Sequence, residues 1–132
     1  MPAQVNFVQL TVLILVREAV NSSMNWQHLT TLEELNVIKN RTGFSIIFKH
    51  STRCSISLMA KKKLDLEGDV ILADIPAYYL DLLNYREISN TIAEVFQVPH
   101  QSPQILLINN GECIFEATHG EISAEELAEQ TA

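Results

Sequence analysis

The chain has 132 residues, of which 16 are acidic and 9 are lysine or arginine, so its formal net charge is −7. That length predicts a single domain whose apolar core needs no disulfide or metal. The acidic balance argues against a nucleic-acid-binding protein, since such proteins need a basic surface to displace counterions. The two cysteines, Cys54 and Cys113, form neither a disulfide framework nor a zinc-binding spacing, so we expect no bound metal and a reducing, cytoplasmic location.

Residues 1–23 do not fit the pattern of the rest of the chain. Their apolar run QLTVLILV is too short to span a bilayer, and no basic residue precedes it as in a signal peptide. Because Met24 stands immediately before recognisable domain sequence, we expect residues 1–23 to be an N-terminal extension, not necessarily native, and residues 24–132 to form the domain. A genuine amphipathic appendage is the alternative, and in neither case do we expect a membrane partner.

The first elements are indicated by changes in apolar spacing. Leucine and isoleucine recur at helical spacing after Thr31, and this predicts a helix over residues 31–41. The short apolar run FSIIFKH, residues 44–50, is typical of a strand buried on both faces. From Cys54 the apolar residues again follow one helical face, which predicts a helix that runs to about Leu66.

The next segment is interrupted by Pro76, since proline cannot continue a regular element. We place a strand at residues 78–83 and leave the form of residues 69–75 open. Asn84 is the expected N-cap of the following helix, whose apolar stripe extends from Ile88 to Phe96.

Two strands and a helix are predicted after the proline-containing stretch VPHQSPQ. The order ILLIN, NG, ECIFEA is a strong hairpin signal, because Asn-Gly favours the tight turn that joins twisted strands. Ser123 and Glu126 have the spacing of a capping box for a last helix. A β-α-β unit followed by a hairpin and a closing helix implies an α/β fold, with a central mixed β-sheet of about four strands flanked by helices.

Cys54 lies where the strand at residues 44–50 has ended and the next helix begins. The first N–H groups of a helix have no partner within the helix and leave a positive potential there. A thiolate at that point is therefore favoured over a thiol, and this makes Cys54 the candidate nucleophile. Lys49, His50 and Arg53 are close in sequence and add positive charge.

The residues around the thiol allow one kind of redox reaction. Ser51 or Thr52 is placed to cap the helix, and Ser57 stands one turn after Cys54, where a dithiol oxidoreductase has its second cysteine. Serine cannot form a disulfide, so Cys54 is limited to an intermolecular mixed disulfide. An inert, buried cysteine is the alternative, and that structural role is the one expected of Cys113.

The stretch HQSPQ is the second feature that points to a substrate site. Pro103 directly precedes ILLI and cannot extend that strand backwards, so the bond before it is either cis or an ordinary trans bond in a loop. Turning the chain at Ser102 leaves its N–H and C=O free, and those groups suit an extended substrate backbone beside the thiol.

Three segments, FKHSTRCSIS, YYLDLLNYREISNTIAEVFQV and HQSPQILLINNG, together resemble the YtxJ-like monothiol bacilliredoxins, and the resemblance covers about residues 24–130. The resemblance implies a thioredoxin-like fold and a small cytoplasmic oxidoreductase that removes bacillithiol from S-bacillithiolated proteins. It also implies bacillithiol, a low-molecular-weight thiol, as co-substrate, and a reductase as a further partner.

The cysteine motif of that family reads Thr-Cys-Pro-Ile-Ser. Cys54 matches its nucleophile, and the last two places, which end at Ser57, are also matched. Arg53 stands between Thr52 and the cysteine, and Ser55 replaces the usual proline, where it adds an N–H and a hydroxyl near the sulfur.

The resemblance also implies the substrate side of the site. Pro103 matches the substrate-side proline of the family, which is taken to be cis, and Ser102 with Pro103 is expected to orient the substrate. His100 is expected to contact the anionic small thiol, and Arg53 to help hold the thiolate. Two alternatives remain open: a non-enzymatic thioredoxin-like binding module or S-thiolation target, and a dithiol reductase that uses both cysteines.

Overall fold

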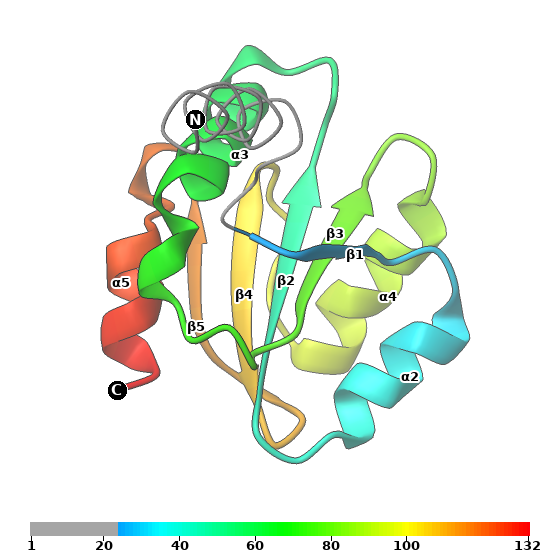
Figure 1. The fold of residues 1–132 in the computed structure, drawn as a ribbon. Helices are drawn as coiled ribbons and strands as arrows, with labels where there is room; N and C mark the ends of the chain where they lie inside the picture. The colour runs from blue at the N-terminus through cyan, green and yellow to red at the C-terminus, as the bar shows by residue number, and fades with distance from the viewer. Residues whose placement is uncertain (1–23) are drawn as a thin grey trace, which may run out of the picture.

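A computed structural model describes residues 24–132, which form a five-stranded mixed sheet covered by helices (Figure 1). The strand order is β1-β3-β2-β4-β5. The strands are β1 Trp26–His28, β2 Phe44–His50, β3 Ala77–Asp81, β4 Gln104–Asn109 and β5 Glu112–Thr118. β1, β3 and β2 run parallel, whereas β4 is antiparallel to β2 and β5 is antiparallel to β4. This topology confirms the expected α/β, thioredoxin-like class, with five strands where about four were expected.

In this part of the chain, four helices lie in two layers. The helices are α2 Leu32–Asn40, α3 Ser55–Glu67, α4 Arg86–Phe96 and α5 Ala124–Gln130, with short 3₁₀ turns η1 Gly68–Val70 and η2 His119–Glu121. α2 and α4 pack on one face of the sheet, and α3 and α5 pack on the other (Figure 1). Each layer buries one face of the central strands, which is why those strands are apolar on both sides.

β2 is buried on both faces, as its short, largely apolar run predicted. Its side chains alternate between the two helical layers, and the alternation includes the two polar residues at the end of the strand. Lys49 therefore reaches Ser89 of α4, while His50 reaches Ser57 of α3. Both side chains are fully buried, so the end of β2 carries two polar groups into the interior from the edge where α3 begins.

β1 and β3 differ from the prediction. β1 was not predicted, because it has three residues, pairs only with β3 and is too short to show a periodic pattern. β3 occupies Ala77–Asp81 rather than residues 78–83. The strand ends early because the chain turns at Asp81, whose C=O accepts the N–H groups of Asn84 and Tyr85.

The same turn overturns the predicted start of α4. Tyr85, not Asn84, occupies the N-cap position. The Asn84 side-chain amide instead donates to Asp81 Oδ2 at 2.7 Å. Asn84 is therefore bonded within the turn and does not cap α4. The helix therefore begins one residue later than an Asn84 cap would place it.

The other local signals are confirmed. Thr31 caps α2 and Ser123 caps α5, each by accepting the N–H of the glutamate three residues later. The hairpin turns at Asn110-Gly111, where both residues have positive φ, as a tight turn between twisted strands requires. Residues 69–75, left open by the sequence, begin in η1 and continue without regular structure.

Residues 1–23, expected to be an N-terminal extension, lie outside the described residues. Within residues 24–132, no helix is both long enough and apolar enough to cross a bilayer.

Candidate active site

Cys54 and Pro103 lie at the same edge of the sheet. β2 ends at His50, β4 begins at Gln104, and the antiparallel register pairs Lys49 with Gln104. The chain that leaves β2 and the chain that enters β4 therefore meet at one edge, where α3 also begins (Figure 1). Segments separated by 49 positions in the sequence are brought together by this one strand pairing.

Cys54 is the N-cap residue of α3 and is half-buried. Its C=O accepts the Leu58 N–H at 3.0 Å, which is the first hydrogen bond of the helix. In residues 24–132 neither the Ser51 nor the Thr52 side chain bonds to the helix, contrary to the expected capping role. Cys54 occupies the N-cap position instead, and its own side chain makes no capping hydrogen bond within the described residues.

Thr52, Arg53 and Ser55 flank the thiol and are exposed. No hydrogen bond or ion pair joins their side chains to another residue in the described range. The three side chains are therefore accessible to a bound molecule, and the predicted support of the thiolate by Arg53 stays a prediction.

Ser57 is fully buried behind the first turn of α3. Its Oγ lies 2.7 Å from His50 Nδ1 and accepts the Ser51 N–H at 2.9 Å. Burial is the main cause that lowers the pKa of His50 below its usual value; the positive charge of Lys61 acts in the same direction, and Asp81 opposes it. The sequence indicated His50 only as a nearby charge, although strand alternation placed it on the α3 side of β2.

The loop before β4 has the expected form. The Ser102–Pro103 bond is cis, and Pro103 is buried. Its C=O accepts the N–H of His119, the first residue after β5, at 3.2 Å. Ser102 Oγ is buried without a hydrogen-bond partner. Within residues 24–132 the N–H and C=O of Ser102 also have none. An extended segment laid beside this loop would therefore find one backbone donor and one backbone acceptor.

A buried lysine supports the loop that carries His100. Lys49 Nζ donates to the Ser89 C=O at 3.1 Å and lies 3.4 Å from His100 Nδ1. Burial lowers the pKa of Lys49 to about 8. The pKa of the exposed His100 is also lowered, by burial of the ring first and then by the charges of Lys49 and Arg86. Lys49 thus acts on the α4 side of the sheet, a contact that the sequence did not predict.

Cys113 is remote from this edge. It stands opposite Ile108 in the ladder, beside the hairpin turn at the other end of β4. Its thiol donates to the Phe115 C=O at 3.4 Å, and burial raises its pKa. Both cysteines are free, and the length of β4 separates them, so the geometry gives no support to a dithiol pair.

An apolar hollow of about 400 Å³ lies between α3 and η2. Its lining residues are Ile56, Met59, Ala60, Lys63, His119, Gly120 and Ile122. Ile56 belongs to the first turn of α3, and the N–H of His119 bonds to Pro103, so the hollow adjoins the edge that carries the thiol. Met59 is 73% exposed, which leaves much of this surface uncovered.

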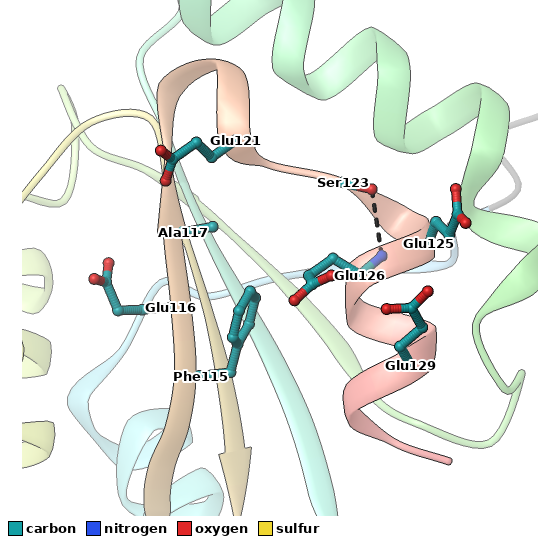
Figure 2. Close-up of a pocket in the computed structure, with 8 residues that line it drawn as sticks. All are labelled: Phe115, Glu116, Ala117, Glu121, Ser123, Glu125, Glu126 and Glu129. Atoms are coloured by element: carbon teal, nitrogen blue, oxygen red, sulfur yellow. Dashed lines mark hydrogen bonds between the residues drawn. The ribbon is translucent and has the colours of Figure 1, made fainter.

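A second hollow, of about 470 Å³, lies between β5 and α5 and has the opposite chemistry. Figure 2 shows its carboxylates, from Glu116, Glu121, Glu125, Glu126 and Glu129. Such a surface repels an anionic thiol. No cluster of His, Cys, Asp or Glu in residues 24–132 has the arrangement of a metal site.

Comparison with known proteins identifies a family to which this chain is similar. A family model described as monothiol bacilliredoxin BrxC matches residues 27–127. Among solved structures, a protein assigned as an oxidoreductase with a thioredoxin fold is similar at 28% identity; the match covers 79% of this chain and 91% of that one, with a TM-score of 0.70.

Two thioredoxins are more distant relatives in structure. Mitochondrial thioredoxin 3 from Saccharomyces cerevisiae is 19% identical, over 84% of this chain and 97% of its own, with a TM-score of 0.61. The N21Q mutant thioredoxin from Halobacterium salinarum is 13% identical, over 85% and 91% of the two chains, with a TM-score of 0.61. At these identities the likeness shows the fold alone, whereas the family match indicates thiol redox chemistry.

Proposed function

Because this chain belongs to the monothiol bacilliredoxin family, we propose that it removes bacillithiol from S-bacillithiolated proteins through a mixed disulfide on Cys54. The observation that carries this proposal is the position of the thiol, at the N-cap of α3 and at the edge where Ser102 leaves backbone groups unpaired. The family match supports thiol–disulfide chemistry in general, and bacillithiol as the small thiol is the specific part of the proposal.

The reaction consists of two thiol–disulfide exchanges. The Cys54 thiolate attacks the bacillithiol sulfur of the protein mixed disulfide; a new S–S bond forms on Cys54, and the protein sulfur leaves as a thiolate that takes up a proton. A second bacillithiol, or a thiol of a reductase, then attacks the disulfide on Cys54 and releases it. Ser57 cannot carry out this second step, because a hydroxyl forms no disulfide, so an external thiol is required.

The substrate contacts come from the loop before β4. The free N–H and C=O of Ser102 would pair with the backbone of the modified protein, and Pro103 would pack against it. The apolar hollow beside α3 would receive a side chain of that protein. These contacts would bring the modified sulfur to Cys54.

The small thiol is anionic, and the α4 side of the same edge supplies the complementary charge. Lys49 donates toward His100 Nδ1, which leaves the ring proton on Nε2 and makes His100 a donor. The charge of Arg86 acts on His100 and therefore lies near it. We propose that His100 and Arg86 bind the anionic groups of bacillithiol, while Arg53 helps to hold the thiolate.

The proposal is tested by replacing each cysteine in turn. Cys54→Ser should reduce release of bacillithiol from a modified protein to the background rate, whereas Cys113→Ser should keep the wild-type rate. Release is followed by the intact mass of the modified protein. Equal rates for the two variants would refute the assignment of Cys54.

The same assay separates the enzyme from a passive thiolation target. A target acquires bacillithiol on Cys54 stoichiometrically but does not turn over when free bacillithiol is supplied. Multiple turnovers per Cys54 are the result we expect. A single turnover with permanent modification of Cys54 would make the chain a target and not an enzyme.

A further inference from the structure

A fully buried lysine lies beneath the loop that carries His100. Lys49 of β2 is 0% exposed, and it makes no ion pair with another residue of the described range. Its Nζ has two partners there, the Ser89 C=O at 3.1 Å and His100 Nδ1 at 3.4 Å. A buried ammonium group without a carboxylate partner is costly, so its few hydrogen bonds constrain the groups that accept them.

The contact with Lys49 determines which ring nitrogen of His100 carries the proton. An ammonium group has three N–H donors and no lone pair, so Nδ1 has to be the acceptor and has to be bare. The Ser89 hydroxyl lies 3.3 Å from the same nitrogen, but a hydroxyl can donate or accept and so fits either tautomer. While Lys49 is charged, the hydrogen of a neutral His100 therefore lies on Nε2.

The surroundings of His100 also disfavour its protonated form. An imidazolium would place an N–H on Nδ1, opposite the Lys49 ammonium. Burial of the ring is the first cause that lowers the pKa of His100; the charges of Lys49 on β2 and Arg86 on α4 add to it, and no carboxylate of the described residues offsets them. Burial lowers the pKa of Lys49 to about 8, so at pH 7 the amine is mostly charged and the imidazole mostly neutral.

The other nitrogen of the ring is available to a ligand. His100 is an exposed residue, although its Nδ1 is turned toward the buried Lys49 and Ser89. Nε2 lies on the opposite side of the imidazole, and within residues 24–132 it has no hydrogen-bond partner. The contacts of Nδ1 therefore leave an unused N–H donor on the loop that also carries Ser102.

We propose that Lys49 is a positioning residue whose buried charge keeps His100 a neutral donor, so that the anionic thiol is recognised at His100 by a hydrogen bond and not by a positive charge. The inference rests on the proposed function in taking bacillithiol as the ligand. Lys49 acts only through His100 and does not touch the ligand. Binding should therefore depend only weakly on pH over the range in which histidines usually become charged.

The first test reads the tautomer and the pKa of His100 from the NMR shifts of its ring nitrogens, without a ligand. In the parent chain at pH 7 the shifts should report a bare Nδ1 and a protonated Nε2. Lys49→Met removes the charge and the donor together, so the pKa of His100 should rise and the tautomer with Nδ1–H should become populated. An unchanged pKa and tautomer in Lys49→Met would overturn the proposal.

Two control variants separate the lysine contact from its surroundings. Ser89→Ala removes the hydroxyl beside Nδ1 but keeps the C=O that Lys49 binds, so His100 should keep its bare Nδ1. Arg86→Gln removes a positive charge that acts on the ring, so the pKa of His100 should rise while the tautomer stays the same. A tautomer that changes in Ser89→Ala and not in Lys49→Met would assign the role to Ser89 and overturn that of Lys49.

The second test measures the affinity for bacillithiol at pH 5.5 and pH 7 in a Cys54→Ser chain, where this thiol cannot exchange. With Lys49 present the two affinities should be nearly equal. With Lys49→Met added, His100 becomes charged as the pH falls, so binding should be about threefold tighter at pH 5.5, the size expected of an exposed ion pair. The titration of bacillithiol itself is common to both chains. An equal ratio of the two affinities in both chains would overturn the proposal.

The two proposals fail separately, because the NMR measurement uses no bacillithiol. A chain that neither binds nor releases bacillithiol, but whose His100 responds to Lys49→Met, would refute the proposed function and leave the control of His100 by Lys49. A chain that releases bacillithiol while its His100 is indifferent to Lys49→Met would refute only the role of Lys49.

Discussion

The polar residues buried at the end of β2 show how single side chains shape the candidate site. Lys49 and His50 are neighbours in sequence, but strand alternation sends one toward α4 and the other toward α3. Each side chain is hydrogen-bonded within its layer, and these bonds offset the free-energy cost of burying a polar group. Lys49 supports the His100 loop, and His50 supports the first turn of α3.

Lys49 gives a prediction about stability. Its pKa is about 8 in the folded protein, against an ordinary value of 10.5. The unfolded chain therefore binds more protons between those values, so the free energy of unfolding should rise as pH increases from about 8 to 10.5, by no more than about 3 kcal/mol. Lys49→Met should abolish this rise, as measured by urea unfolding at several pH values.

Lys62→Met is the control for that experiment, because Lys62 is exposed on α3. It should keep the pH dependence of the parent chain. A Lys49→Met chain that kept the same dependence would show that the buried amine is not its source.

At the scale of elements, the sequence predicted most of the local structure, the β-α-β unit and the hairpin, but not the pairing of β1 with β3 or of β2 with β4. The hairpin, the caps at Thr31 and Ser123, and the break at Pro103 were predicted because each signal is local. β1 was not predicted because this outermost strand has three residues, which are too few to show a period in apolar spacing. The Asn84 cap was wrong because a turn at Asp81 uses that amide first.

The candidate site was predictable to the same degree. Cys54 and Pro103 stand out in the sequence, since a thiol before a helical pattern and a proline before a strand are local features. The contacts of Ser57 with His50, and of Lys49 with His100, depend on which helix packs on which face of β2. Two polar residues at the end of a largely apolar strand were the only sign of these contacts in the sequence.

The exposed face of α3 gives a prediction at the same scale. Met59→Glu places a charge in the apolar hollow beside the thiol and should raise the KM for a modified protein about fivefold, through the loss of about 1 kcal/mol of apolar contact. The rate of Cys54 alkylation should not change. Steady-state kinetics on a bacillithiolated protein measure the effect.

Leu66→Glu is the matched control, because Leu66 is an equally exposed apolar residue of α3 that does not line this hollow. Its KM should equal that of the parent chain. Equal KM values for all three chains would show that protein substrates dock elsewhere.

On the scale of the whole molecule, the net charge is −7, and the charged side chains are unevenly distributed over the surface. Five glutamates line the hollow between β5 and α5 (Figure 2). The edge that carries Cys54 has Arg53 beside the thiol and Arg86 near His100. An anionic thiol is repelled by the first region and attracted by the second, so the charge pattern favours approach at the thiol edge.

The proposal that Cys54 is the exchanging thiol is tested most directly by intact mass after exposure to oxidised bacillithiol. The account predicts the addition of one bacillithiol, located on Cys54 by peptide mapping and removed by free bacillithiol. Modification of Cys113 instead, or a loss of two hydrogens that reports a Cys54–Cys113 disulfide, would contradict it.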